Sequence, residues 1–151
     1  AGLLSREPCF KLKVSVMDMK LHEDAIHRGP AQVFPAIRDG IREAMGDAKP
    51  VIFEPLQILQ IEAPEDYLGE ISKLVQNKRG QLLDMTQDGN HISVKVKIPV
   101  SEMFGLSGDL RSATGGRGSQ FLVDQFYEKI PPEIQDKVVA LIRQRKGLDK
   151  A

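Results

Sequence analysis

The sequence predicts an α+β protein in two parts: a strand followed by a helix in residues 1–49, and a βαββαβ domain with a final helix in residues 50–151. Two observations predict this class. Some short segments alternate apolar with polar residues, as a strand with one buried face does, and others repeat apolar residues at helical spacing. With 41% hydrophobic and 28% charged residues, the composition is that of a globular protein.

The first part begins with a predicted strand and ends with a predicted helix. The strand, residues 10–16, has four alternating apolar positions: Phe10, Leu12, Val14 and Val16. After the polar segment HEDAIHRGPA, a helix is expected over residues 32–46, with the apolar stripe Val33, Ile37, Ile41 and Met45. Proline at 35 is tolerable only near the first turn, and Gly46 and Pro50 are typical of a helix end. We therefore place a domain boundary near residue 49.

The second part reads as a regular succession of short elements. A strand is expected over residues 57–62, and a helix starts after Pro64 and ends at Arg79-Gly80. A hairpin follows, with its turn at residues 87–90 and its second strand at residues 92–98. Ser101 is expected to cap a short helix bearing Phe104 and Leu110, and residues 121–126 are expected to form the last strand.

The resulting βαββαβ order is the ferredoxin-like arrangement, in which two helices cover one face of a four-stranded antiparallel sheet. The other face is left for binding or for another covering element. The final helix has one apolar stripe that must dock against something, formed by Ile134, Val138, Leu141 and Ile142. Its cationic end, residues 143–146, suits the dipole of a helix C-terminus.

Charge and cysteine content exclude several classes of protein. The 21 basic residues balance 21 acidic ones, so any nucleic-acid binding must depend on local patches. The single cysteine, Cys9, cannot form an internal disulfide or a zinc site alone, which favours a reducing, cytoplasmic location. No apolar run reaches the length of a membrane helix, and the N-terminal residues do not resemble a signal sequence. Because Ala1 stands where an initiator Met would be, we expect a fragment.

HEDAIH is the densest group of reactive side chains. A metalloprotease helix needs H-E-x-x-H, so that both imidazoles lie on one helical face. His22 and His27 are instead separated by about 140° on an ideal helix, which excludes a shared helical metal site. A metal held across a loop with Asp24 remains open, as does a polar loop carrying two solvated histidines.

Other motifs are weaker. Neither a catalytic triad nor a G-x-S-x-G motif is present, and GGRG lacks the lysine and spacing of a phosphate loop, so we expect no GTP binding by this route. GGRG is better explained as a flexible turn with glycines at positive φ. RGSQFLVDQF fits the RNA-recognition signature only partly. A basic edge facing RNA phosphates is a further hypothesis, with the candidates Lys73, Lys78, Arg79, Arg111 and Arg117.

Three segments in order, LHEDAIHRGPAQ, NKRGQ and FGLSGDLRSATGGRG, resemble elongation factor 2 of archaea and eukaryotes over essentially the whole chain. The resemblance implies that residues 1–49 are the end of domain IV, an incomplete ribosomal-S5-domain-2-like β-α piece, and that residues 50–151 are domain V. Gly29-Pro30-Ala31 replaces the glycine run of eukaryotic members, which looks archaeal and makes the loop stiffer because proline fixes φ.

The resemblance also implies a chemical role for His27. In this family the histidine before Arg-Gly becomes diphthamide, through an aminocarboxypropyl group attached to an imidazole carbon and then methylated and amidated. Toxins of the diphtheria type transfer ADP-ribose from NAD to diphthamide. The same motif gives Asp24, Arg28 and Gly29 the task of shaping the loop, with His22 in support.

For function, the resemblance implies the ribosome-facing end of a factor that promotes GTP-dependent translocation. The expected partners are the ribosome, its rRNA, tRNA and mRNA in the decoding centre, the diphthamide-modifying enzymes and ADP-ribosylating toxins. Possible rRNA contacts are Lys78, Arg79, Arg111 and Arg117. This chain would hold neither catalytic residues, metal nor cofactor, since GTP and Mg belong to a distant domain of the parent. Two alternatives stay open: a free-standing ferredoxin-like RNA-binding module, and a small metal-dependent enzyme that uses His22, Asp24 and His27.

Overall fold

The computed structural model describes residues 1–148. The chain divides into two compact units, residues 1–52 with 130–151 and residues 53–129, and each unit is described by itself. Residues 149–151, which end the predicted second domain, lie outside the described residues. Within the described part, no helix has the length and apolar character needed to cross a bilayer.

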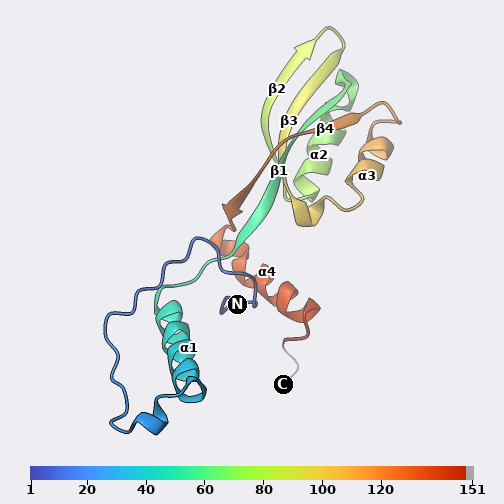
Figure 1. The fold of residues 1–151 in the computed structure, drawn as a ribbon. Coiled ribbons are helices and arrows are strands. Elements are labelled where there is room, and N and C mark those ends of the chain that lie inside the picture. Colours follow the sequence, from blue (N-terminus) through green and yellow to red (C-terminus); the bar gives the residue numbers. More distant parts are fainter. Residues whose placement is uncertain (149–151) are drawn as a thin grey trace. The chain divides into compact units, whose positions relative to one another are not determined.

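Residues 53–129 form the predicted βαββαβ fold (Figure 1). The strands are β1 (Phe53–Pro64), β2 (Gln81–Asp88), β3 (His91–Pro99) and β4 (Ser119–Lys129). The helices are α2 (Leu68–Asn77) and α3 (Leu106–Ala113), preceded by the 3-10 turns η2 (Glu65–Tyr67) and η3 (Val100–Glu102). The sheet order is β2-β3-β1-β4 with every pairing antiparallel, which confirms the ferredoxin-like prediction.

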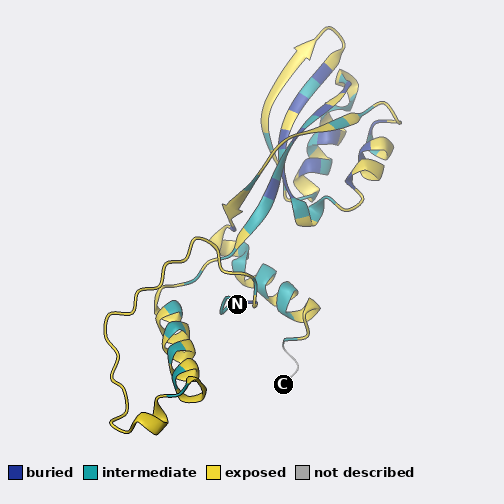
Figure 2. Ribbon diagram, in the orientation of Figure 1, coloured by how far each residue is buried: buried dark blue, intermediate teal, exposed yellow. Residues whose placement is uncertain are grey.

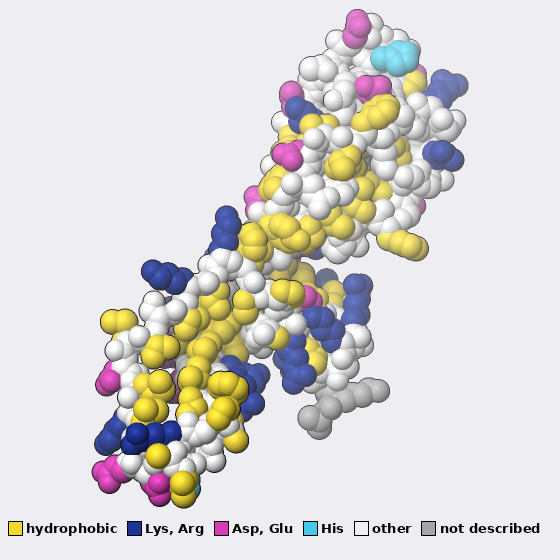
Figure 3. All heavy atoms as spheres, viewed as in Figure 1, with side chains coloured by type: hydrophobic (Ala, Val, Ile, Leu, Met, Phe, Trp, Pro, Cys, Tyr) yellow, Lys and Arg dark blue, Asp and Glu magenta, His cyan; other side chains and the backbone are white. Residues whose placement is uncertain are grey.

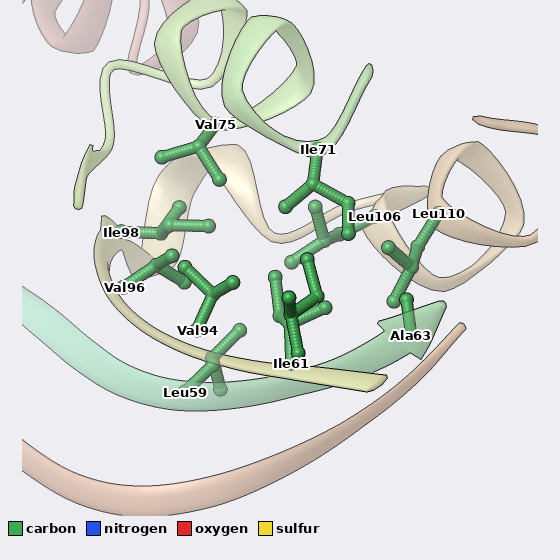
Figure 4. Packing of buried hydrophobic residues seen from close by; sticks show 11 residues of the cluster. Leu59, Ile61, Ala63, Ile71, Val75, Val94, Val96, Ile98, Leu106 and Leu110 are labelled. Atoms are coloured by element: carbon green, nitrogen blue, oxygen red, sulfur yellow. The ribbon is translucent and has the colours of Figure 1, made fainter. Parts of the chain in front are cut away.

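The core of this unit lies between one face of the sheet and the two helices. Alternate residues of β3 point inward because successive side chains in a strand lie on opposite faces. Figure 4 shows them packed with residues of β1, α2 and α3. The buried cluster consists of Leu59, Ile61, Ala63, Ile71, Val75, Ile92, Val94, Val96, Ile98, Leu106 and Leu110.

The prediction for the segment after β3 was partly wrong. Ser101 does not cap a helix, because residues 100–102 form a single 3-10 turn that ends when Met103 N–H bonds to the Val100 carbonyl. Gly105 then adopts a φ of +77°, which an α-helix does not accommodate, so α3 starts only at Leu106. Phe104 therefore lies in the loop before the helix, whereas Leu110 lies in α3 as predicted.

The other unit contains α1 (Pro30–Asp47) and α4 (Pro132–Arg145). Proline at the first position of α1 suits a helix start, since that residue needs no N–H partner. Pro35 lies further inside the helix than expected. The predicted stripe of α1 is confirmed, because Val33, Ile37, Ile41 and Met45 are half-buried while their neighbours are exposed.

The predicted strand over residues 10–16 does not form. Residues 7–22 have no regular secondary structure, and the four alternating apolar side chains are exposed (Figure 2). A strand exists only when a neighbour accepts and donates its backbone hydrogen bonds, and residues 1–148 supply none for this segment. Residues 10–16 thus have the apolar alternation of a half-buried strand, but no partner strand among residues 1–148.

The final helix α4 docks with residues 4–7 through its cationic end. Arg143 Nη1 donates to the Leu4 carbonyl at 3.1 Å, and Lys146 Nζ donates to the Ser5 carbonyl at 3.1 Å. Lys146 also pairs with Glu7 at 2.6 Å. The predicted apolar stripe of α4 is only partly covered, since Leu141 stays exposed.

Candidate functional site

The HEDAIH segment forms a small loop closed by its own hydrogen bonds. Asp24 caps the 3-10 turn η1 (Ala25–His27), with Oδ1 accepting the Ile26 N–H at 3.2 Å. His22 Nδ1 accepts the Asp24 N–H at 3.0 Å. Two side chains of the motif thus satisfy backbone donors at the start of the turn, as capping residues do. Both hydrogen bonds lie within the motif itself.

Arg28 closes the loop from the opposite end. Its Nε donates to the His22 carbonyl and its Nη2 donates to the Glu23 carbonyl, both at 2.7 Å. A guanidinium presents several donors in a fixed fork, so one side chain can hold two successive carbonyls. Gly29 follows as the residue that caps α1, with extended backbone angles. The structure thus brings together the four predicted supporting residues around His27.

His27 ends the 3-10 turn and is exposed. Its ring lies edge-to-face against that of His22, with centroids 4.7 Å apart and an interplanar angle of 70°. The turn itself is closed by the His27 N–H, which bonds to the Asp24 carbonyl at 3.2 Å. The geometry presents the imidazole of His27 to solvent on a backbone that is held in place. Across residues 1–148, no group of three His, Cys, Asp or Glu side chains could hold a metal ion.

The four candidate rRNA contacts fall into two kinds. Lys78 is paired with Asp109 at 2.9 Å, and Arg79 is paired with Glu54 at 2.6 Å. In contrast, neither Arg111 nor Arg117 forms an ion pair within the described residues. Because a cation already paired with a carboxylate has less to gain from a phosphate, Arg111 and Arg117 are the better candidates.

Arg111, in the last turn of α3, and Arg117 lie on either side of a loop organised by Thr114. The Thr114 hydroxyl is fully buried, donates to the Leu110 carbonyl at 2.7 Å and accepts the Gly118 N–H at 2.8 Å. Gly116 N–H bonds to the Arg111 carbonyl at 2.8 Å, and a Cβ at Gly118 would lie 2.7 Å from the Thr114 hydroxyl. The positive φ predicted for this turn is found at residues 115 and 116, but the role of Thr114 was not predicted. The sequence signal that could have indicated this role is a threonine directly before two glycines.

RGSQFLVDQF, the segment that partly fits the RNA-recognition signature, consists of the first eight residues of β4 and the two residues before them. β4 pairs only with β1 within residues 1–148, so it is an edge strand. Phe121 lies opposite Gln60 and is about half exposed, at 54%. The position at the sheet edge agrees with the interpretation of this segment as ordinary strand sequence.

Comparison with known proteins decides the family. The family described as Elongation factor G, domain IV matches residues 1–49, and the family described as Elongation factor G C-terminus matches residues 51–147. The chain belongs to the family of elongation factors G and 2. Residues 1–49 thus match domain IV of that family, and residues 51–147 match its C-terminal domain.

Similar relatives in this family include archaeal elongation factors 2. Those of Nanoarchaeum equitans and Methanocaldococcus jannaschii are each 49% identical over 147 residues, and that of Methanosphaera stadtmanae is 48% identical. Each match covers 97% of this chain, which spans about a fifth (20%) of the length of these relatives. The identification predicted from the three motifs is confirmed.

A solved structure supports the fold assignment. The crystal structure of ttk003000868 from Thermus thermophilus is similar with a TM-score of 0.58 and 31% identity. The similarity covers 66% of this chain and 15% of the other. The mixed helix-and-sheet architecture of this chain is therefore shared with a protein of known structure.

Proposed function

We propose that this chain is the ribosome-facing end of a translational elongation factor that moves tRNA and mRNA through the ribosome. In this proposal, residues 1–49 act as the C-terminal part of domain IV and present His27, while residues 50–151 act as domain V. The observation that carries it is the ordered match of both family descriptions to one chain. The parent supplies GTP hydrolysis, and this chain is not an enzyme by itself. Its location is the cytoplasm, with the ribosome.

The proposed role of His27 is to accept the diphthamide modification. An enzyme that attaches a carbon chain to an imidazole carbon needs a ring that it can surround and a loop that keeps the ring in place. His27 is exposed, and the bonds from His22, Asp24 and Arg28 hold the backbone around it. These contacts support the proposal. Diphthamide enzymes and ADP-ribosylating toxins are the implied partners of this loop.

Mass spectrometry of the full-length factor tests the proposal for His27. Trypsin cuts after Lys20 and Arg28, so residues 21–28 form one peptide that contains both histidines. We expect added mass on His27, located by fragment ions, when the factor is made in an archaeal host with the diphthamide pathway. The control is the same peptide from bacterial expression, which should have no added mass. An unmodified His27 from the archaeal host would contradict the proposal.

For domain V, we propose that Arg111 and Arg117 contact rRNA phosphates. Each phosphate contact contributes about 0.7 to 0.9 to the slope of log affinity against log salt. In ribosome binding by the full-length factor, Arg111→Gln should reduce that slope by about 0.7 to 0.9, the contribution of one phosphate contact. Arg79→Gln is the control and should change the slope less, because the guanidinium of Arg79 is already paired with Glu54. Equal slopes for the two variants would count against this assignment.

A further inference from the structure

Phe104 is the most exposed of the large apolar residues in the residue 53–129 unit. Its side chain is 95% exposed, more than that of any other exposed phenylalanine or tyrosine in the described residues. The residues on either side of the Phe104-Gly105 loop are anchored differently: Leu106 is fully buried, and Met103 packs against the core. The exposure of Phe104 is therefore a property of this loop and not of an unfolded segment.

Hydrogen bonds fix the backbone beneath the ring. Lys78 Nζ donates to the Phe104 carbonyl at 3.2 Å, and the Leu106 N–H bonds to the Met103 carbonyl at 3.1 Å. Gly105 has a φ of +77°, and its carbonyl accepts the Asp109 N–H at 2.9 Å. A side chain on such a backbone loses little additional entropy when a partner covers it, because the loop is already ordered.

Comparison with Met17 shows why an exposed apolar side chain on a hydrogen-bonded backbone is unusual. Met17 is similarly exposed, at 90%, but it lies in a segment without secondary structure. Exposure of an apolar residue in such a segment needs no explanation. Phe104 is held outward next to a complete core, and rigid exposed aromatic residues are the usual anchors of protein interfaces.

The charges around Phe104 favour a protein partner over RNA. Lys78 is paired with Asp109, and Arg79 is paired with Glu54 and lies 3.9 Å from Glu102. Three carboxylates thus face two cations near the base of the loop. A phosphate backbone approaching the ring would meet carboxylates and neutralised cations, so base stacking by RNA is disfavoured.

The size of the anchor favours a partner within the same polypeptide. A buried aromatic side chain contributes about 150 to 250 Å², whereas each side of a stable interface between separate proteins buries about 800 Å². A single ring is sufficient when the partner is covalently linked, because the effective concentration is then high. The matched region is 20% of the length of the archaeal relatives, so most of such a polypeptide lies outside this chain.

We propose that Phe104 inserts into an apolar pocket on another domain of the full-length factor and holds domain V against it. The loop between β3 and α3 (Figure 1) is then an intramolecular docking element. Figure 3 shows hydrophobic side chains exposed on this unit, but among the described residues only Phe104 combines nearly full exposure with a fixed backbone next to the core. This inference does not depend on modification of His27 or on the rRNA contacts.

Oxidative footprinting with mass spectrometry tests the proposal directly. Hydroxyl radicals should oxidise Phe104 readily in this chain and at least about fivefold more slowly in the full-length factor free in solution, because burial blocks access. Equal oxidation of Phe104 in the two proteins would overturn the proposal. Protection that appears only after ribosomes are added would also overturn it, and would assign the pocket to the ribosome.

Substitution provides a second, independent measurement. In the full-length factor, Phe104→Ser should lower the melting temperature, and Phe104→Leu should restore most of the loss because an apolar side chain still fills the pocket. In this chain alone, both variants should melt within about 1 °C of the wild type, since Phe104 contacts little here. Equal effects of Phe104→Ser in the two proteins would contradict an interdomain pocket.

Discussion

Residues 10–16 and β3 have the same sequence pattern and opposite structures. Each has four apolar residues at alternate positions, interleaved with lysine and serine. In β3 the four apolar side chains are at most 3% exposed, whereas in residues 10–16 they are 49% to 65% exposed. The difference is the neighbourhood: β3 lies between β1 and β2, while residues 10–16 pair with no strand among residues 1–148. Alternation therefore specifies which face of a strand is apolar, but a strand forms only beside a partner.

The largest expected effect comes from supplying that partner. If domain IV sequence from an archaeal elongation factor 2 is joined before residue 1, we expect residues 10–16 to join a sheet. Their amide hydrogens should then exchange more slowly by about a hundredfold or more, because strand hydrogen bonds protect them. The melting temperature of this half should rise as well. Exchange at the unprotected rate in both proteins would show that the missing partner is not the cause.

The same substitution in the two segments sharpens the comparison. Val94→Ala in β3 should lower the free energy of unfolding of the residue 53–129 unit by about 2 kcal/mol, because two buried methyl groups are lost and a cavity remains. Val14→Ala should change the stability of this chain by less than about 0.5 kcal/mol, since its side chain is half exposed. Urea unfolding measures both. Similar losses would mean that residues 10–16 are packed in solution.

Alanine substitutions at two glycines compare a tightly packed with a loosely packed position in the residue 53–129 unit. A Cβ at Gly80 would lie 2.8 Å from Val75 Cγ1 and 2.9 Å from Ile98 Cγ1, so Gly80→Ala should destabilise by about 1 to 2 kcal/mol. Gly69→Ala is the matched control, because a Cβ there meets no atom within 4 Å. It should leave the melting temperature unchanged or raise it slightly, as alanine favours a helix over glycine. Thermal unfolding of the two variants checks both expectations.

The smallest effect is local and concerns the His27 loop. Asp24→Ala removes the acceptor of the Ile26 N–H. Loss of a capping side chain destabilises the turn that it caps by about 1 kcal/mol. The Ile26 amide should therefore exchange about fivefold faster, while the unfolding of residues 53–129 stays the same. Asp24→Asn keeps an acceptor oxygen and should restore slow exchange. Faster exchange in the asparagine variant as well would indicate that charge, and not the cap, holds the turn.

Most of the fold was predictable because its signals are local. The alternation in β3, the apolar stripes of α1 and α2 and the turn at Gly89 indicated the elements and their order. The segment 100–106 was harder, since Ser101 is a plausible cap and only the left-handed backbone of Gly105 delays the helix. A single sequence does not reveal which glycine will adopt that conformation.

The candidate functional residues also include some contacts that are local in the sequence and others that only the structure reveals. His27 and its supporting residues were predicted from the HEDAIHRG motif. The hydrogen bonds among these residues span at most six positions, so they are local in the sequence. The pairing of Lys78 with Asp109 and of Arg79 with Glu54 joins residues at least 25 positions apart. The sequence therefore predicted four equivalent cations, and the structure separated two that are paired from two that form no ion pair within residues 1–148.

By itself, the sequence determined the βαββαβ order, the family and the residues of the His27 loop, because strand alternation, helical spacing and short motifs depend on near neighbours. Only the tertiary structure decided that residues 10–16 are exposed, that Thr114 organises the loop between Arg111 and Arg117, and that Phe104 faces solvent. Burial and ion pairing depend on which distant segments meet, and that information lies in the packing of the chain.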